Sequence, residues 1–153
     1  MAEVDGMRSI CNAVLALLAL VACGPPTVRV LHHRQDLAAA RAEEFARVAF
    51  VERDAGRAYA LLWDEGKKRV SSDSVAAGIM KMHPKGYPVQ IKAMEYEPIF
   101  GQPAMNIFLD GSGADEEFHY RLILQGTAET NYRVSDFFRG SGPYPPSPNR
   151  KPL

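Results

Sequence analysis

Apolar residues in the first half of the chain recur at the spacing of α-helices. We expect one helix over residues 37–53, with Asp36 as its N-cap. A second, short helix follows Asp54. A third follows Ser71 and stops at His83-Pro84, because proline cannot continue a helix. The pattern predicts a helical first half.

From residue 89 the apolar residues alternate, which is typical of β-strands. We expect about four strands, at residues 89–97, 105–109, 118–124 and 132–138. The alternation of the last strand places Asp136 on the same side as Tyr132 and Val134. Helices followed by an antiparallel sheet make an α+β fold. The proline-rich residues 140–153 are expected to form a flexible tail.

The segment before the helices has a different character. Residues 13–22 are apolar and uncharged, and as a helix they would reach roughly 15 Å. That is half of a bilayer core of roughly 30 Å, but it suits the apolar region of a signal peptide. The alternative is a buried helix of a soluble protein.

The tetrapeptide that ends this segment, Leu20-Val21-Ala22-Cys23, resembles the lipobox of bacterial lipoprotein signal peptides. The resemblance implies that residues 1–22 are removed and that Cys23 carries lipid. Residues 23–35 then form the lipidated tether, and residues 36–139 the folded domain. Glu3 and Asp5 are unusual at the start of a signal peptide, so Met7 is a candidate true start.

The same resemblance implies export and attachment to a bacterial membrane, with the domain facing the periplasm or the cell exterior. Gly24 after the cysteine resembles lipoproteins sorted to an outer membrane. Basic and acidic residues number 18 each, without long runs, which gives no electrostatic footprint for nucleic acid.

The two cysteines limit the chemistry of the domain. Cys11 lies in the segment expected to be removed, and Cys23 is the expected lipid site. No thiol then remains for a disulfide, a thiolate metal site or a nucleophile. His32-His33 stands alone in the tether, so we expect neither a metal nor a cofactor.

Three helices followed by about four long strands resemble the nuclear transport factor 2-like superfamily. Residues 54–63 and residues 131–138 carry the likeness, which covers residues 36–139. The resemblance implies a curved antiparallel sheet with three helices packed on it, in the shape of a cone. That superfamily contains enzymes and binding domains, so the fold does not decide the function.

Several side chains are candidates for lining such a cone. The possible pocket residues are Tyr59, Trp63, Tyr120, Tyr132 and Asp136. The alternative is that the aromatic residues only pack in the core. Asp64 and Glu65 precede three cations, which is typical of a solvated helix end. His119 alternates with Tyr120, which favours a position on the polar face.

Three functional hypotheses remain open. We favour a lipoprotein domain without a catalytic set that binds a small hydrophobic ligand or an envelope protein. The first alternative is an acid/base enzyme of the isomerase or dehydratase type, which requires Asp136, Tyr59 or His119 to converge on one closed pocket. The second is a structural subunit of an envelope assembly, which predicts an exposed apolar patch on the sheet face.

Overall fold

A computed structural model describes residues 32–153 of the chain. The expected signal peptide (residues 1–22), the lipidation site Cys23 and the tether up to residue 31 lie outside the described residues. These predictions are therefore not addressed by the structure.

The first described helix, α2, spans Gln35–Ala46 and continues into a π-helical turn, η1, over Arg47–Val51. It begins earlier than expected. Arg34 occupies the N-cap position, and the Asp36 side chain makes an ion pair with Arg34 at 2.5 Å instead of capping the helix. Arg53, with a positive φ of 60°, separates this helix from the next.

The following helices are α3 (Ala55–Ala60), α4 (Asp64–Lys67) and α5 (Ser72–Met82). Two predicted caps are confirmed. The Asp54 carboxylate accepts a hydrogen bond from the Arg57 N–H at 2.9 Å, and the Ser71 hydroxyl oxygen accepts one from the Ser74 N–H at 3.1 Å. As predicted, α5 ends at His83-Pro84.

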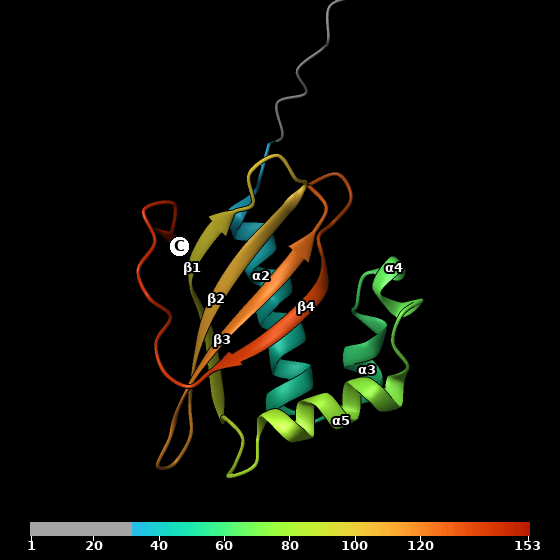
Figure 1. Cartoon of the computed structure of the whole chain (residues 1–153), viewed down its shortest axis with the longest axis vertical. Helices are drawn as coiled ribbons and strands as arrows, with labels where there is room; N and C mark the ends of the chain where they lie inside the picture. The colour runs from blue at the N-terminus through green and yellow to red at the C-terminus, as the bar shows by residue number, and fades with distance from the viewer. Residues whose placement is uncertain (1–31) are drawn as a thin grey trace, which may run out of the picture. The chain divides into compact units, whose positions relative to one another are not determined.

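An antiparallel sheet follows, with the order β4-β3-β2-β1-β5. Its strands are β1 (Gln90–Pro98), β2 (Ala104–Ser112), β3 (Glu117–Gln125), β4 (Arg133–Gly140) and β5 (Lys151–Pro152). Helix α2 runs across one face of this sheet, with α3 and α5 beside its lower end (Figure 1). The predicted α+β class is confirmed.

The fifth strand comes from the segment that the sequence suggested as a flexible tail. Lys151 and Pro152 pair with Tyr96 and Glu95 of β1. Tyr144 packs against Phe108 on the sheet face that α2 does not cover, with ring centroids 5.4 Å apart. The residues that make these contacts have no apolar periodicity, so the sequence pattern did not indicate the strand.

Strand β4 contains a bulge at Ser135, because Ile123 pairs with Asp136 whereas the next residue, Leu124, pairs with Val134. One extra residue reverses the alternation of every side chain after it. The prediction that Asp136 shares the buried face of Tyr132 and Val134 is therefore wrong. Asp136 is exposed, and Phe137 turns towards the core instead.

Candidate functional site

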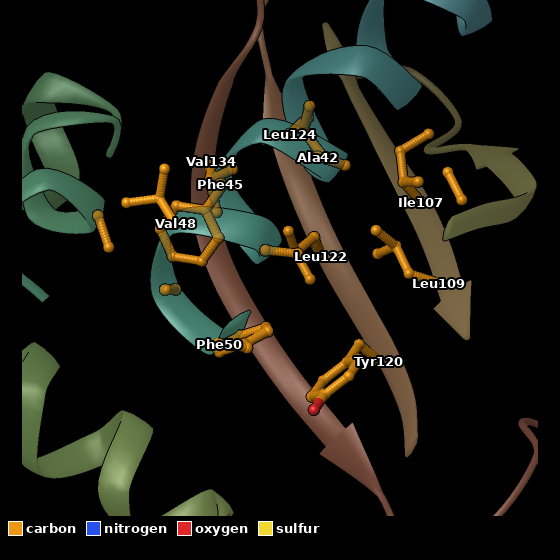
Figure 2. Close-up of a cluster of buried hydrophobic side chains, with 14 of the residues drawn as sticks. Ala42, Phe45, Val48, Phe50, Ile107, Leu109, Tyr120, Leu122, Leu124 and Val134 are labelled. Carbon is orange, nitrogen blue, oxygen red and sulfur yellow. The ribbon is translucent and has the colours of Figure 1, made fainter. Parts of the chain in front are cut away.

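The interior between α2 and the sheet is filled by side chains (Figure 2). Phe50 stacks on Tyr120 with ring centroids 4.7 Å apart, and Phe45 packs against Phe137 at 5.2 Å. Leu122 and Leu124 of β3 are fully buried beside them. The described interior is thus a packed core.

A large open groove lies instead along the first half of β1. Its volume is about 980 Å³. It is lined by residues from α2 and η1 on one side and from the sheet on the other: Ala40, Glu43, Glu44, Arg47, Val51, Val89, Gln90, Ile91, Lys92, Asp110, Gly111, Ser112, Glu117 and His119. None of the five predicted pocket residues is among them.

The groove exposes an unpaired length of β-strand edge. Residues 90–93 pair with β2 on one side, and β5 pairs with β1 only at Glu95 and Tyr96. In the part of the chain that the structure describes, no strand covers the other side of residues 90–93. The N–H of Ala93 donates instead to the Glu43 carboxylate of α2, at 2.8 Å.

A bulge at Met94 separates this open length of β1 from the part that β5 covers. The pairing with β2 shifts there, between Ala93 and Glu95. At the bulge itself, the C=O of Met94 accepts a hydrogen bond from the N–H of Leu153 at 3.0 Å. Bulges bend a strand and locally interrupt its ladder. The bulge therefore marks where the groove ends and where the C-terminal segment starts to cover β1.

The charged side chains of the groove carry both signs. Glu44 pairs with Arg41 at 2.7 Å, and Arg47 forms an ion pair with Glu52. Lys92 and Glu117 have no ion-pair partner within residues 32–153 and are exposed. A lining of mixed sign beside an open backbone edge suits a polypeptide better than a ligand that carries a single charge.

His119 lies on the opposite face of β3 from Tyr120, as the alternation predicted. Its side chain is only 13% exposed, because it lies beside Asp110 on the paired strand β2. The Nδ1 atom of His119 is 2.8 Å from an Asp110 carboxylate oxygen. This pair forms part of the groove wall, a role that strand register alone reveals.

The five predicted pocket residues are scattered. Tyr120 is buried in the core, whereas the hydroxyl of Tyr132 reaches the start of α2 and accepts the Arg34 N–H at 2.9 Å. Tyr59 donates its hydroxyl to the Lys67 carbonyl at 3.3 Å. The N–H of Trp63 donates to the Val134 carbonyl at 2.8 Å, and Asp136 is exposed. These residues do not meet around one cavity.

One buried polar cluster was not predicted from the sequence. His83, which is only 4% exposed, places Nε2 2.7 Å from the Tyr120 hydroxyl and Nδ1 2.7 Å from the Ile79 carbonyl. Since a carbonyl only accepts, Nδ1 donates to Ile79, and Nε2 of the neutral ring accepts from Tyr120. Tyr87 stacks on the imidazole with ring centroids 4.5 Å apart.

Burial perturbs the titration of this cluster in both partners. It lowers the pKa of His83 and raises the pKa of Tyr120 well above its usual range. The neutral hydrogen-bonded pair is therefore the stable form near neutral pH. The sequence showed His83 only as part of a helix stop, because its neighbour Tyr120 lies on a distant strand.

The other charged candidates are placed as solvated surface groups. Asp64 pairs with Lys67 at 2.8 Å and Glu65 with Lys68 at 2.6 Å, so this helix end is solvated as expected. His33 contacts the hydroxyl of Tyr132 at 3.4 Å. Over residues 32–153 no three His, Cys, Asp or Glu side chains are grouped closely enough to hold a metal ion.

Within the same residues, no helix has both the length and the apolar character needed to cross a membrane. Comparisons with models of protein families, with curated proteins and with solved structures gave no match for this chain.

Proposed function

We propose that this chain is an exported bacterial lipoprotein, held at the membrane by lipid on Cys23, whose domain binds an envelope protein. The lipobox-like sequence before Cys23 supports the anchor. The domain is an α+β unit whose helices precede an antiparallel sheet, and this order supports a nuclear transport factor 2-like cone. It faces the periplasm or the cell exterior.

The open edge of β1 in its groove is the observation that carries the binding role. An extended segment of a partner can add to an exposed strand edge, where main-chain hydrogen bonds supply affinity and neighbouring side chains supply selectivity. Residues 90–93 offer such an edge, and Glu43 already binds one of its N–H groups. The preferred partner is therefore a protein with an extended segment that carries both charge signs.

The other hypotheses gain less from the geometry. A small hydrophobic ligand would need an enclosed apolar cavity, but the interior is filled, and the groove is open and carries charged side chains among its apolar ones. The acid/base hypothesis required Asp136, Tyr59 or His119 to converge, and they lie apart. A structural subunit would use a bare sheet face, but residues 140–153 cover part of that face, with Arg150 placed 3.8 Å from the Phe108 ring centroid.

The anchor is tested by Cys23→Ser. We expect this variant to fold normally, because the substitution lies before the folded domain, but to lose the added mass of the lipid and to leave the membrane fraction. Mass spectrometry and cell fractionation measure the two effects. Membrane retention of the variant through an uncleaved segment would refute lipid anchoring.

The groove is tested by photocrosslinking in intact cells that express the full chain. A photoreactive benzoylphenylalanine replaces Val89, which lines the groove and is 65% exposed. Met80 on α5, which is 66% exposed and outside the groove, is the matched control position. We expect an adduct with a defined envelope protein at position 89 and none at position 80. Equal yields at the two positions, or no adduct at position 89, would refute the groove as the binding site.

A further inference from the structure

Three segments of the chain meet at one end of the sheet. The N–H of Gly126, which follows β3, donates to the carbonyl of Pro103 in the β1–β2 turn at 2.6 Å. The hydroxyl of Tyr132, just before β4, accepts the N–H of Arg34 at the start of α2. The β1–β2 turn, the β3–β4 turn and the first described residues therefore lie at the same end, the upper one in Figure 1.

The β1–β2 turn at this end is uncharged and apolar at its tip. Residues 98–104 contain no Asp, Glu, Lys, Arg or His, and Phe100 is fully exposed. The backbone of this turn has a defined shape. The N–H of Gln102 donates to the Ile99 carbonyl at 3.1 Å, and Gly101 adopts the positive φ of 71° that glycine tolerates without strain. Phe100 is thus presented to solvent by a defined backbone.

The opposite end of the sheet has the reverse character. The turn between β2 and β3 contains Asp115 and Glu116, and Glu117 begins β3; Glu116 forms an ion pair with Arg139 of β4. Strand β2 has nine residues, and at about 3.4 Å per residue it places the two turns roughly 30 Å apart. The two ends therefore differ in these turns. The first, called here the Phe100 end, has an uncharged turn with a protruding ring beside the charged residues Arg34, Asp36 and Glu129. The second, called here the acidic end, has an acidic turn.

We infer that the Phe100 end is the membrane-facing end of the domain, and that Phe100 inserts into the interface of the bilayer that holds the lipid on Cys23. The inference rests on the proposed lipid anchor. From Cys23 to His32 the extended chain reaches at most about 30 Å, so the start of the domain and the turns beside it stay within that distance of the lipid. Anionic lipid repels the acidic end.

One aromatic side chain suffices in this setting because the anchor has already brought the domain to the surface. Insertion is then an intramolecular step with a high effective concentration of lipid. Burying one phenyl ring favours the inserted orientation by roughly tenfold or more. The groove, which is lined by Ser112 and Glu117 near the acidic end, then faces away from the membrane, where an envelope protein can reach it.

The orientation is testable with single-cysteine labels, because the mature chain is expected to carry no thiol besides the acylated Cys23. The acylated full-length product of Gln102→Cys, next to Phe100, is labelled with a fluorophore. Asp115→Cys, which is exposed at the acidic end, is the matched control. Both proteins are placed in vesicles of phosphatidylethanolamine and phosphatidylglycerol whose acyl chains carry bromine, which quenches fluorophores at membrane depth.

We expect strong quenching at position 102 and none at position 115. Adding Phe100→Ser is expected to abolish most of the quenching at position 102, whereas thermal unfolding stays unchanged because Phe100 makes no core contact. Equal quenching at both positions, quenching at neither, or quenching that survives Phe100→Ser would overturn the inference. A stable dimer of Gln102→Cys, cross-linked through position 102, would also overturn the inference.

The same samples separate this inference from the anchor on which it depends. A chain that carries lipid by mass and stays with the vesicles, but shows no quenching at position 102, refutes only the orientation. A chain without lipid that does not bind vesicles refutes both.

Discussion

The packed interior and the β1 groove lie against the same helix, yet they differ in every physical respect. Inside, Phe45 and Phe50 of α2 and η1 meet rings from the sheet, and the hydrogen-bonded His83–Tyr120 pair is buried beside them. In the groove, Glu43 and Arg47 of the same helix face charged side chains and an open strand edge. A partner therefore has room to bind where strand pairing stops, rather than where the aromatic residues gather.

The difference also separates stability from binding. Core side chains lose much free energy when truncated, because the space they leave is not refilled. Groove side chains remain in contact with water, so their replacement is expected to change binding more than folding. The following substitutions test this division, starting with the largest expected effect.

Phe50→Ala is expected to lower the free energy of unfolding by about 3–5 kcal/mol, because it removes a fully buried ring from the contact with Tyr120. Urea unfolding followed by circular dichroism measures this. Val89→Ala in the groove is the control, with an expected change within about 0.5 kcal/mol. Similar losses for the two variants would contradict the division.

Tyr120→Phe keeps the buried ring but removes the hydroxyl that donates to Nε2 of His83. A buried acceptor without its partner costs about 1–3 kcal/mol. The same unfolding measurement applies, with Tyr59→Phe as the control, because the Tyr59 hydroxyl makes a longer bond at 3.3 Å in a partly solvated place. A loss no greater than that of the control would show that this hydrogen bond contributes little.

The buried imidazole also predicts a pH dependence. Burial lowers the pKa of His83 below its ordinary value of 6.5, so below that pH the unfolded chain binds more protons than the folded one. The contribution of His83 is present in full above about pH 6.5. It is lost as pH falls towards the lowered pKa, by up to about 1.4 kcal/mol per pH unit.

Unfolding of the wild type and of His83→Gln between pH 7.5 and about 5 measures this contribution, as the difference between the two pH profiles. The difference removes the titration of other groups that the two proteins share. Parallel profiles would mean that His83 keeps its ordinary pKa in the folded domain.

Glu43→Ala has the smallest expected effect on folding. It removes the acceptor of the Ala93 N–H at a partly solvated edge, with an expected cost of about 0.5–1 kcal/mol. Amide hydrogen exchange at Ala93 is expected to accelerate in this variant, and Glu43→Gln, which keeps an acceptor oxygen, is expected to restore most of the protection. Unchanged exchange in Glu43→Ala would show that water replaces the carboxylate without loss.

Local signals in the sequence predicted much of the fold. The caps at Asp54 and Ser71 and the stop at His83-Pro84 depend on neighbouring residues only, and all three were right. The bulge at Ser135 could not be read from alternation, because the extra residue is recognisable only against the register of β3. Strand β5 was missed because its two residues have no pattern of their own.

The candidate site was less predictable for the same reason. Tyr120 and Tyr132 were correctly seen as apolar-face residues, but nothing in the sequence distinguishes a ring that lines a pocket from a ring that fills a core. The groove combines residues of α2 with the ends of three strands, so it exists only once the strands are paired. Asp110 and His119 are nine positions apart in the chain, and their contact follows from the β2–β3 register.

The bulge at Ser135 has a consequence for how this fold can change over generations. Deletion of Ser135 would remove the extra residue and leave a regular strand, in which Val134 and Asp136 become neighbours and point to opposite faces. Asp136 would still face outward and Phe137 inward, so a single codon lost from the gene would straighten β4 and leave the core residues in place. The bulge is thus the position at which β4 can lose a residue without reversing the alternation of the side chains that follow.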